Sequence, residues 1–386
     1  MAKKIRVWDG TAWQDVAPSL PYTAIHSAQA SMPLTGVDGQ VWLDTDGTLA
    51  GQDFVPLSGG TMTGNLNTPS INSGPIVGRN KILNGDFSIW QRGTTGGNGF
   101  LADRWYLNAG SATSFSQTRQ AFTPGSAPVS GYEGKYFWRN TITNVGSETA
   151  WYLNTYIEDV QTLAGQTATF SFWAKADSAR AMSGYLLQRF GDGGSTNVST
   201  TIGTASLTTS WQRFTFTISI PSLSGKTIGA NNLVQIFFAM SPASGMVIDL
   251  WGVQLEAGSI ATPYHNATPN QQTELAACQR YYYRIAKSGG SAGVGQVLYN
   301  GNSNAGYGIL NLPVSMRIPP SSIEFSNLTM LQPGVTTFGV SNVALANERT
   351  ENVVTFGTTS SGGMANGNAY FLFVSSGGHF AVSAEL

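Results

Sequence analysis

Carboxylates that could act as an acid–base pair occur in this sequence, but their spacing does not bring two of them together. A glycoside hydrolase holds two carboxyl groups at a set separation across the bond that it cleaves. The acidic residues that could serve are scattered instead, at Glu158, Asp159, Asp177, Asp192, Asp249, Glu256 and Glu324. Scattered carboxylates are typical of turns and solvated faces, so the sequence predicts no glycosidase and no enzyme.

Motifs for nucleophilic, phosphate or metal chemistry are not found in the sequence either. The three histidines, His26, His265 and His379, stand far apart and lack the spacing of zinc ligands. No Gly-x-Ser-x-Gly elbow leads from a strand into a helix, and no Gly-x-x-x-x-Gly-Lys-Ser/Thr loop exists. The single cysteine, Cys278, excludes an intrachain disulfide and is expected to be a small buried hydrophobe. We therefore expect no catalytic residue, no metal and no cofactor.

Aromatic side chains are the remaining resource for binding. The flat faces of sugars stack on Trp and Tyr, and neutral amides and hydroxyls complete such sites. Trp151 and Tyr156, which neighbour the polar Asn154, are predicted to lie on an exposed or concave face, and Tyr185 and Trp138 are the next candidates. Core packing is the alternative role for each of these rings.

Composition limits the classes of partner. The 386 residues carry 20 basic and 21 acidic side chains, with no cluster of Lys and Arg that would follow a nucleic-acid backbone. Hydrophobic residues reach 41%, which argues against a disordered chain. The basic start is followed by no apolar stretch, and no run of about 18 apolar residues occurs. We expect no nucleic-acid partner, no secretory signal and no membrane insertion.

Alternation at period two predicts a β-sandwich in the central part of the chain. Residues 214–220 alternate apolar and polar side chains, and residues 233–240 form a nearly continuous apolar run that suits a central strand. At the two ends of this part, residues 80–93 and 247–258 are predicted to be the first and last strands. Asn84-Gly85 is predicted to be a turn, because both residues tolerate a positive φ.

One helix is predicted, over residues 268–284. Thr268 is expected as its N-cap, Pro269 as its first helical residue, and Gln271 as the partner in a capping box. Three side chains fall on one face, at Leu275, Cys278 and Tyr282. About four turns are marginally stable alone, so the helix must pack on a domain or on symmetry mates.

Residues 1–55 contain a weak internal repeat. The stretches 7–16 and 41–55 both carry Val-Trp, then Asp-Gly-Thr, then Gln-Asp, which predicts two hairpins with Asp-Gly at their tips. Hairpins this small can hardly build a core alone, so they are expected to pack on neighbouring chains or on a larger partner. Residues 56–79 are rich in Gly, Ser, Thr and Pro and have the composition of a linker.

Within this linker, Leu57-Ser-Gly-Gly-Thr-Met-Thr-Gly-Asn-Leu66 resembles an element that recurs in the shafts of trimeric bacteriophage tail fibres. It occurs here once, which implies a neck rather than a long shaft. Three chains that meet on an axis need glycine for close approach and a few apolar side chains to fill the centre. The resemblance therefore implies a homotrimer whose neck is filled by Leu57, Met62 and Leu66.

The predicted sandwich carries a second resemblance. Ile82-Leu-Asn-Gly-Asp-Phe87, Ala102-Asp-Arg-Trp105 and Val253-Gln-Leu-Glu-Ala-Gly258 resemble the jelly-roll modules of phage tail fibres. Those modules are similar in turn to the carbohydrate-binding jelly rolls of polysaccharide-degrading enzymes. The carbohydrate-binding modules often hold a structural calcium ion near their first and last strands, where this chain has Asp86 and Asp249. Asp86 has the alternative role of capping the turn.

The distal part of the chain is predicted to be β-structure as well. Glu274–Tyr283 resembles the short helix that follows the sandwich in many of these fibre proteins. Residues 312–319 and 384–386 resemble the small β-sandwich at the tips of phage fibres. The distal residues are a rival to the central sandwich as the part that meets the host.

The predicted fold is therefore all-β and trimeric, with five parts. These are an N-terminal virion-attachment segment at 1–55, a Gly/Ser-rich trimeric neck at 56–79, a carbohydrate-binding-like jelly roll at 80–266, a connecting helix at 267–285 and a distal β-sandwich at 286–386. The resemblance implies a virion tail fibre, assembled in the host cytoplasm, that attaches to other tail or baseplate proteins through its N-terminus and recognises a host-surface glycan. A fibre-borne polysaccharide depolymerase and a capsid-surface decoration fibre are the alternatives.

Overall fold

The structure is a computed structural model, and the chain divides into two units, Met1–Thr68 and Pro69–Leu386. Its described residues are 11, 78–110, 114–129, 132–299, 301, 304–332, 336–362, 364–365 and 368–385, with the backbone of short strands at 5–8, 13–15, 27–29, 41–44, 70–71 and 74–75. The predicted neck residues Leu57, Met62 and Leu66 lie outside the described part. Strands dominate the rest, so the prediction of an all-β protein with one short helix is confirmed.

The N-terminal unit contains one four-stranded sheet, in the order β2-β1-β4-β3. Its strands are β1 (Ile5–Trp8), β2 (Trp13–Asp15), β3 (Ser27–Gln29) and β4 (Val41–Asp44). β1 and β2 pair antiparallel, as predicted for the first hairpin, and the residues that would complete the second hairpin lie outside the described part. Because β1 also pairs with β4, the two copies of the repeat share one sheet. At the start of the second unit, β5 (Ser70–Ile71) pairs with β6 (Gly74–Pro75).

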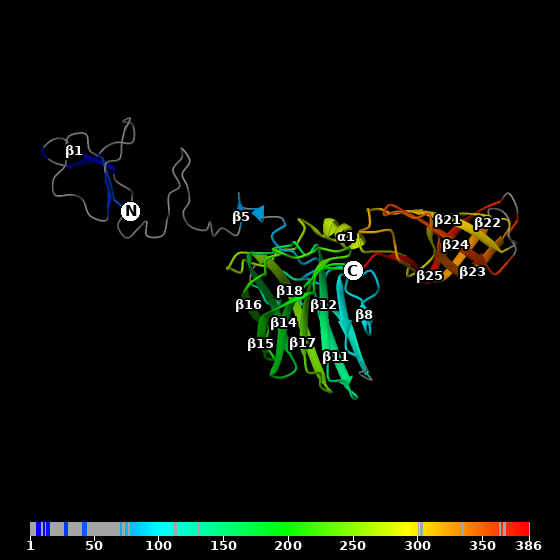
Figure 1. The fold of residues 1–386 in the computed structure, drawn as a ribbon, viewed down its shortest axis with the longest axis horizontal. Helices are drawn as coiled ribbons and strands as arrows, with labels where there is room; N and C mark the ends of the chain where they lie inside the picture. Colours follow the sequence, from blue (N-terminus) through cyan, green and yellow to red (C-terminus); the bar gives the residue numbers. More distant parts are fainter. Residues whose placement is uncertain are drawn as a thin grey trace. The chain divides into compact units, whose positions relative to one another are not determined.

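Two six-stranded antiparallel sheets form the central sandwich (Figure 1). The first, here called the β18 sheet, has the order β16-β13-β18-β11-β10-β7, with bounds Gln212–Ser219, Thr167–Ala176, Met246–Ala257, Tyr136–Asn144, Ser114–Ala121 and Thr95–Gly96. The second, the β17 sheet, has the order β15-β14-β17-β12-β9-β8, with bounds Val198–Leu207, Arg180–Arg189, Leu233–Met240, Trp151–Glu158, Trp105–Asn108 and Gly99–Phe100.

The inward side chains of the two sheets meet in a single hydrophobic core. Alternate residues of the longer strands enter it, as the period-two pattern predicts. The contact between Phe172 of β13 and Phe238 of β17, with ring centroids 4.8 Å apart, joins the sheets directly. The largest fully buried side chains of this core are Trp105, Trp138, Trp151, Phe87, Phe170, Phe172 and Phe238. Each such side chain stabilises the sandwich by about 1.5–3 kcal/mol through burial.

The predicted first strand is not a strand. Residues 80–93 run in turns beside β18, and only two backbone hydrogen bonds of 2.9 Å join them to it, from Lys81 N to Leu255 O and from Val253 N to Gly85 O. A Cβ at Gly85 would lie 2.2 Å from the Val253 carbonyl oxygen, so only glycine allows this approach. Asn84-Gly85 forms a turn, as predicted, but the turn joins no hairpin and instead packs its segment against β18.

Asn84 itself is fully buried, with a φ of 54°. Its side chain accepts a hydrogen bond from Ile89 N and donates to Ile89 O and Asp103 O, each at 2.9 Å. Its carbonyl accepts from Trp105 Nε1 at 3.0 Å. Asparagine adopts a positive φ more readily than most residues, which suits it to this position. Through these hydrogen bonds, Asn84 of the 82–87 motif connects its segment to Asp103 and Trp105 of the 102–105 motif.

The helix, α1 (Gln271–Gln279), starts later than predicted. Its N-cap is Asn270, whose side chain accepts from Thr273 N at 3.0 Å, and Thr273 completes the capping box. The predicted N-cap Thr268 instead donates to the Glu274 carboxylate through its backbone and its hydroxyl. The error is one of register: Asn270 and Thr273 form the capping box two residues after the predicted pair, Thr268 and Gln271.

One side of α1 faces the sandwich. Glu274 is fully buried and accepts from Asn84 N at 2.6 Å, and Cys278 is buried as expected. The predicted face is otherwise displaced, because Leu275 is only partly buried and Tyr282 lies in the following strand, β19 (Tyr282–Ala286). The helix therefore anchors on the sandwich through a hydrogen-bonded carboxylate as well as through apolar contact.

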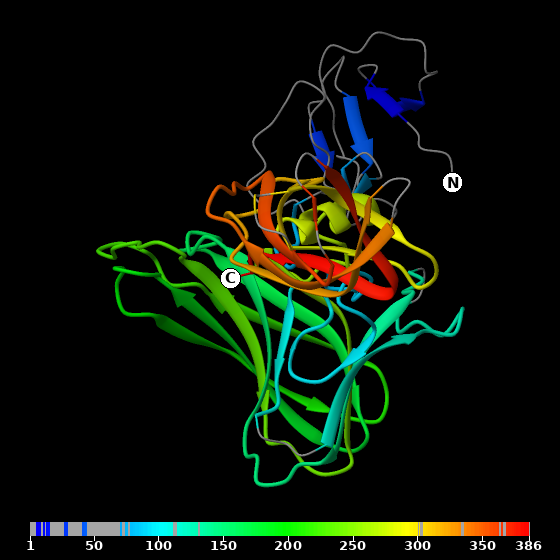
Figure 2. The ribbon, with the colours of Figure 1, turned by 90° about the vertical axis from the view of Figure 1, so that its right-hand side faces the viewer.

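The distal strands form one sheet that closes into a barrel, where the sequence predicted a sandwich. Its order is β19-β25-β20-β21-β24-β23-β22, with bounds Tyr282–Ala286, Ala369–Ser383, Ala292–Tyr299, Ala305–Asn311, Val353–Ser360, Thr336–Leu345 and Ser322–Gln332. Because the long β25 pairs with β20 on one side and with β22 on the other, the sheet has no free edge there. The yellow-to-red strands form this closed ring in Figure 2. No helix of the described residues is long and apolar enough to cross a membrane.

Candidate functional site

The outward face of the β17 sheet carries a continuous set of aromatic and amide side chains. In β12 the even-numbered residues from Tyr152 point outward, opposite to the buried Trp151. Antiparallel pairing sets Asn154 opposite Phe237 of β17, and Phe237 opposite Tyr185 of β14. Directly paired residues share a face of the sheet, so these side chains form one surface. We call it the aromatic face and define it by Phe100, Tyr106, Tyr152, Asn154, Tyr156, Tyr185, Gln235 and Phe237.

A first group of rings lies over β12, β17 and β14. The rings of Tyr185 and Phe237 are stacked, with centroids 5.0 Å apart and an interplanar angle of 19°. Tyr152 meets Phe237 edge to face at 6.0 Å and is 38% exposed. The group therefore offers flat, accessible ring surface with hydroxyl groups at its margins.

A second group lies over β8, β9 and β12. Phe100 contacts Tyr106 at 5.1 Å and Tyr156 at 6.2 Å between ring centroids. Asn154 is paired with Phe237 on one side and with Tyr106 on the other, so its amide lies between the two ring groups. That amide accepts from Gln235 Nε2 at 2.8 Å and donates to the Tyr106 carbonyl at 3.2 Å.

Charged side chains flank the aromatic face at one end of β17 and beside Phe100, whose ring centroid lies 5.1 Å from the Arg92 guanidinium. Arg189 and Glu158 are both paired with Leu233 at the end of β17. Glu158 accepts two hydrogen bonds, of 3.1 and 3.0 Å, from the guanidinium of Arg280. Among the strand residues of this face, Glu158 is the one carboxylate. Burial raises the pKa of Tyr156 above its ordinary value, so its hydroxyl stays protonated near neutral pH.

The C-terminal residues help to hold the second ring group in place. Arg104, which is 1% exposed, donates from Nη2 to the Tyr156 carbonyl at 2.7 Å. Its guanidinium lies 3.4 Å from the centroid of the Tyr281 ring and forms an ion pair with Glu385. The Ala-Asp-Arg-Trp motif at 102–105 therefore connects the aromatic face to the segment that follows the helix and to the end of the chain.

Two of the four predicted binding residues lie on the aromatic face, and two do not. Tyr156 and Tyr185 are on it, although in different ring groups. Trp138 and Trp151 are fully buried in the sandwich core, so their prediction as surface residues is wrong. Their indole nitrogens donate to Gln117 at 3.1 Å and to Asn140 at 2.9 Å, which satisfies both polar groups inside the core. A ring without exposed surface cannot stack on a sugar.

The remaining members of the aromatic face were not predicted from the sequence. A usable signal existed in β12, because Trp151 and Tyr152 are neighbours and must point to opposite faces of a strand. Because Leu153 is apolar and expected in the core, Trp151, two residues before it, points into the core as well, and Tyr152 points outward. Tyr106 and Phe237 had no comparable local signal, since their position on the face depends on pairing with strands far along the chain.

The opposite sheet offers no equivalent surface among the described residues. The outward side of the β18 sheet is covered by an aromatic cluster in which Trp251 and Tyr264 are buried. Trp173 and Trp211 pack partly buried against it. The aromatic face of the β17 sheet is thus the accessible ring surface of the sandwich.

The two residues considered for calcium do not form a metal site. Both carboxylate oxygens of Asp249 accept from Arg139, at 2.6 and 2.7 Å, and Lys175 Nζ lies 3.5 Å away. A cation there would displace side chains that already neutralise the carboxylate. Asp86 accepts from Ser88 N at 3.2 Å, and burial raises its pKa. No group of three or more metal-ligating side chains occurs among the residues that the structure describes.

No family model and no curated protein matches the chain. Among solved structures, the enzymatically active domain of tailspike protein 4 of bacteriophage CBA120 aligns with 47% of this chain, at 13% identity and a TM-score of 0.32. This chain covers 22% of that protein.

Two carbohydrate-binding modules align with the chain as well. A CBM4 structure covers 46% of this chain and 99% of its own length, at 24% identity and a TM-score of 0.30. TmCBM61 in complex with β-1,4-galactotriose covers 47% of this chain and 99% of its own length, at 14% identity and a TM-score of 0.29.

Proposed function

We propose that this chain is a subunit of a phage tail fibre whose central sandwich binds a neutral glycan of the host surface. The aromatic face supports this assignment most directly. It combines two groups of accessible rings with an amide pair between them, and the side chains that define it are all uncharged. Rings that stack on sugar faces, together with neutral hydrogen-bonding groups, suit a carbohydrate better than a charged partner.

The arrangement of the rings suits an extended glycan. The Tyr185–Phe237 stack and the Tyr106–Phe100 pair lie on either side of Asn154 across neighbouring strands. A chain of sugars that crosses the strands meets a ring, an amide and a second ring in turn. Several units would then share the contact, with their hydroxyl groups directed at the amides and the tyrosine hydroxyls.

A single face of this kind binds weakly. We expect a dissociation constant near the millimolar range, which corresponds to about −4 kcal/mol. Three copies on one axis would engage a polymeric glycan together, and the effective concentration of the second and third faces would raise the avidity. Weak single sites with strong joint attachment suit reversible adsorption to a cell surface.

The fibre assignment is supported by the sequence motifs. The decamer at 57–66 resembles the shaft element of trimeric tail fibres, and we propose that it forms the neck of a homotrimer. Residues 1–55 would attach the fibre to other tail or baseplate proteins in the virion. A decoration fibre on the capsid would share every feature of the aromatic face and differ only in where this N-terminal segment docks.

We propose binding without cleavage. A depolymerase needs two carboxyl groups at the bond that breaks, and among the strand residues of the aromatic face Glu158 is the one carboxylate, held by Arg280. Incubation of the full-length protein with host polysaccharide should leave the chain length of the polymer unchanged. Shortened polymer chains would favour the depolymerase instead.

The binding proposal is tested with the full-length protein and the double variant Tyr152→Ala, Tyr185→Ala. Both changes remove ring surface and leave the core intact, and we expect adsorption to host cells or their purified glycan to fall at least about tenfold, from a loss of about 1 kcal/mol per ring. Tyr136→Ala, in the β18 sheet, is the matched control and should adsorb as the parent does. Equal adsorption of all three proteins would refute a role for the aromatic face.

A further inference from the structure

The barrel carries an exposed apolar patch on the outward side of β20, β21 and β25. Leu298 and Tyr307 are each 57% exposed, Ile309 is 55% exposed and Phe371 is 39% exposed. Leu298 is paired directly with Tyr307, while Gln296 has Ile309 opposite it on one side and Phe371 on the other. We call these five residues the barrel patch.

The apolar side chains of the barrel patch could not be accommodated in the barrel core. In β21 the inward positions are glycines and Leu310, and a Cβ at Gly308 would lie 2.4 Å from the Phe356 ring. The core has no room for larger side chains at these positions. Tyr307 and Ile309 occupy the alternate, outward positions, where their apolar surface gains nothing from the folding of a single chain.

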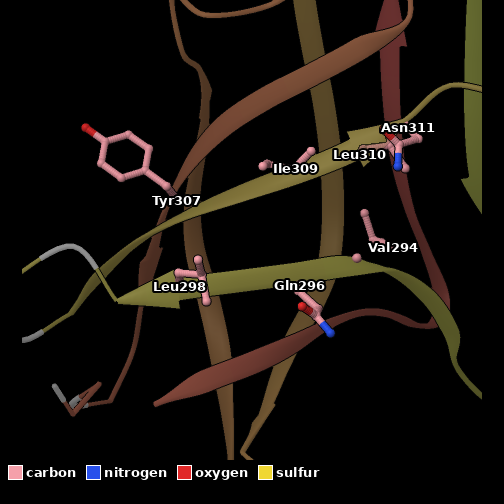
Figure 3. A pocket seen from close by; sticks show the side chains of 8 residues that line it. Val294, Gln296, Leu298, Tyr307, Ile309, Leu310 and Asn311 are labelled. Carbon is pink, nitrogen blue, oxygen red and sulfur yellow. The ribbon is translucent and has the colours of Figure 1, made fainter. Parts of the chain in front are cut away.

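A groove of about 510 Å³ runs along this face. Figure 3 shows Gln296 and Leu298 on one strand and Tyr307, Ile309 and Asn311 on its neighbour. Contiguous exposed apolar surface of this kind is uncommon on a soluble monomer and marks a contact surface. Two exposed aliphatic side chains beside the rings suit a protein partner better than a sugar, whose hydroxyl groups they cannot satisfy.

The lack of charged residues on these strands indicates which kind of protein surface can bind there. Residues 292–311, which include both β20 and β21, contain no Asp, Glu, Lys, Arg or His. A strongly charged partner would therefore find no counter-charge on these strands. A second copy of the same neutral face buries no charge at all, so like surfaces can meet without an electrostatic penalty.

Gln296 gives a more specific reason for contact between like copies. It is the one amide of the barrel patch and lies between Ile309 and Phe371. An apolar partner would leave its amide without hydrogen bonds, at a cost in free energy. Because a carboxamide both donates and accepts, the same residue from another copy can satisfy it, and in a cyclic arrangement every copy is satisfied equally.

We propose that the barrel patch is a contact between copies of this chain, with the Gln296 amides bonded to one another around the symmetry axis. The assignment rests on the trimeric fibre proposed above, and it adds a second point of assembly distal to the neck. Association at the barrel would hide the exposed apolar side chains and leave the aromatic face of each sandwich for the host.

The test uses the full-length chain with the substitution Gln296→Cys. The native Cys278 is fully buried, and burial raises the pKa of its thiol, so it can stay in place. Mild oxidation with diamide should link two of every three chains into a species of twice the 40.9 kDa chain mass on a non-reducing gel. Ser199→Cys, at an exposed position of β15, is the matched control and should remain unlinked.

A further substitution in the same chain tests the patch itself. Adding Ile309→Glu to Gln296→Cys places a carboxylate at each contact, and the linked species should be lost while circular dichroism stays unchanged. A trimer by sedimentation with no link at position 296 would overturn the proposal and leave the fibre intact, and a monomer at micromolar concentration would overturn both. A loss of glycan binding on Tyr307→Ala without any link would make the groove a sugar site and also refute the contact. If chains are linked at position 296 but the Tyr152→Ala, Tyr185→Ala variant adsorbs as the parent does, the contact between copies is supported and the glycan-binding proposal is refuted.

Discussion

Replacing Asn84 with Ala is expected to lower the free energy of unfolding of the sandwich by about 4 kcal/mol. The substitution removes the hydrogen-bond partners of two buried backbone groups, Ile89 N–H and Asp103 C=O, each of which costs about 1–3 kcal/mol when left unsatisfied. A non-glycine residue without a polar side chain at a φ of 54° adds about 1 kcal/mol of strain. The Ile89 carbonyl still accepts from Asp103 N, so it adds little to the loss.

Urea unfolding of the full-length protein, followed by tryptophan fluorescence, measures this loss. Asn84→Gly is the matched control, because glycine adopts the positive φ without strain and lacks only the side-chain hydrogen bonds. We expect it to be about 1 kcal/mol more stable than Asn84→Ala and still well below the parent. An unfolding midpoint of Asn84→Gly equal to that of the parent would show that the buried hydrogen bonds do not stabilise the sandwich, and the reasoning would fail.

Three further predictions concern the core, a buried acid and the neck. Trp151→Ala should lower the free energy of unfolding by about 3–5 kcal/mol, because it empties a fully buried site, while any protein that remains folded binds glycan normally; equilibrium unfolding and a binding assay check this. Burial raises the pKa of Asp103 to about 6, so between about pH 4 and pH 6 the native state keeps a proton that the unfolded state releases, and stability should fall as pH rises through this window. Asp103→Asn should remove that slope in unfolding curves measured across the window. Replacing Leu57, Met62 and Leu66 together with Ser should lower the dissociation temperature of the trimer without unfolding the sandwich; an unchanged temperature would show that the chains are held elsewhere.

Much of the fold could be predicted locally. Period-two alternation identified β-structure across the centre, and the run at 233–240 became β17, a strand inside its sheet. The helix was found because its periodicity and its capping residues are close together in sequence, although the cap itself is Asn270. The misassigned strand at 80–93 has the opposite cause. Its Asn84-Gly85 pair is typical of a turn, while its conformation depends on contacts with Val253 and Glu274, far along the chain.

Composition and local pattern alone determined the all-β class, the low charge, the position of the helix and the supply of rings for a binding surface. Tertiary structure decided which rings are available. Trp151 and Tyr152 are adjacent and of similar chemistry, yet one is in the core and the other on the aromatic face. Strand alternation requires them to face opposite ways, and the apolar Leu153 favours Trp151 as the inward one. Only the pairing of β12 with β17 and β9 brings Phe237 and Tyr106 onto the face that carries Tyr152. Such pairs join residues far apart in the sequence, as Asn154 and Phe237 are, so no local pattern contains them.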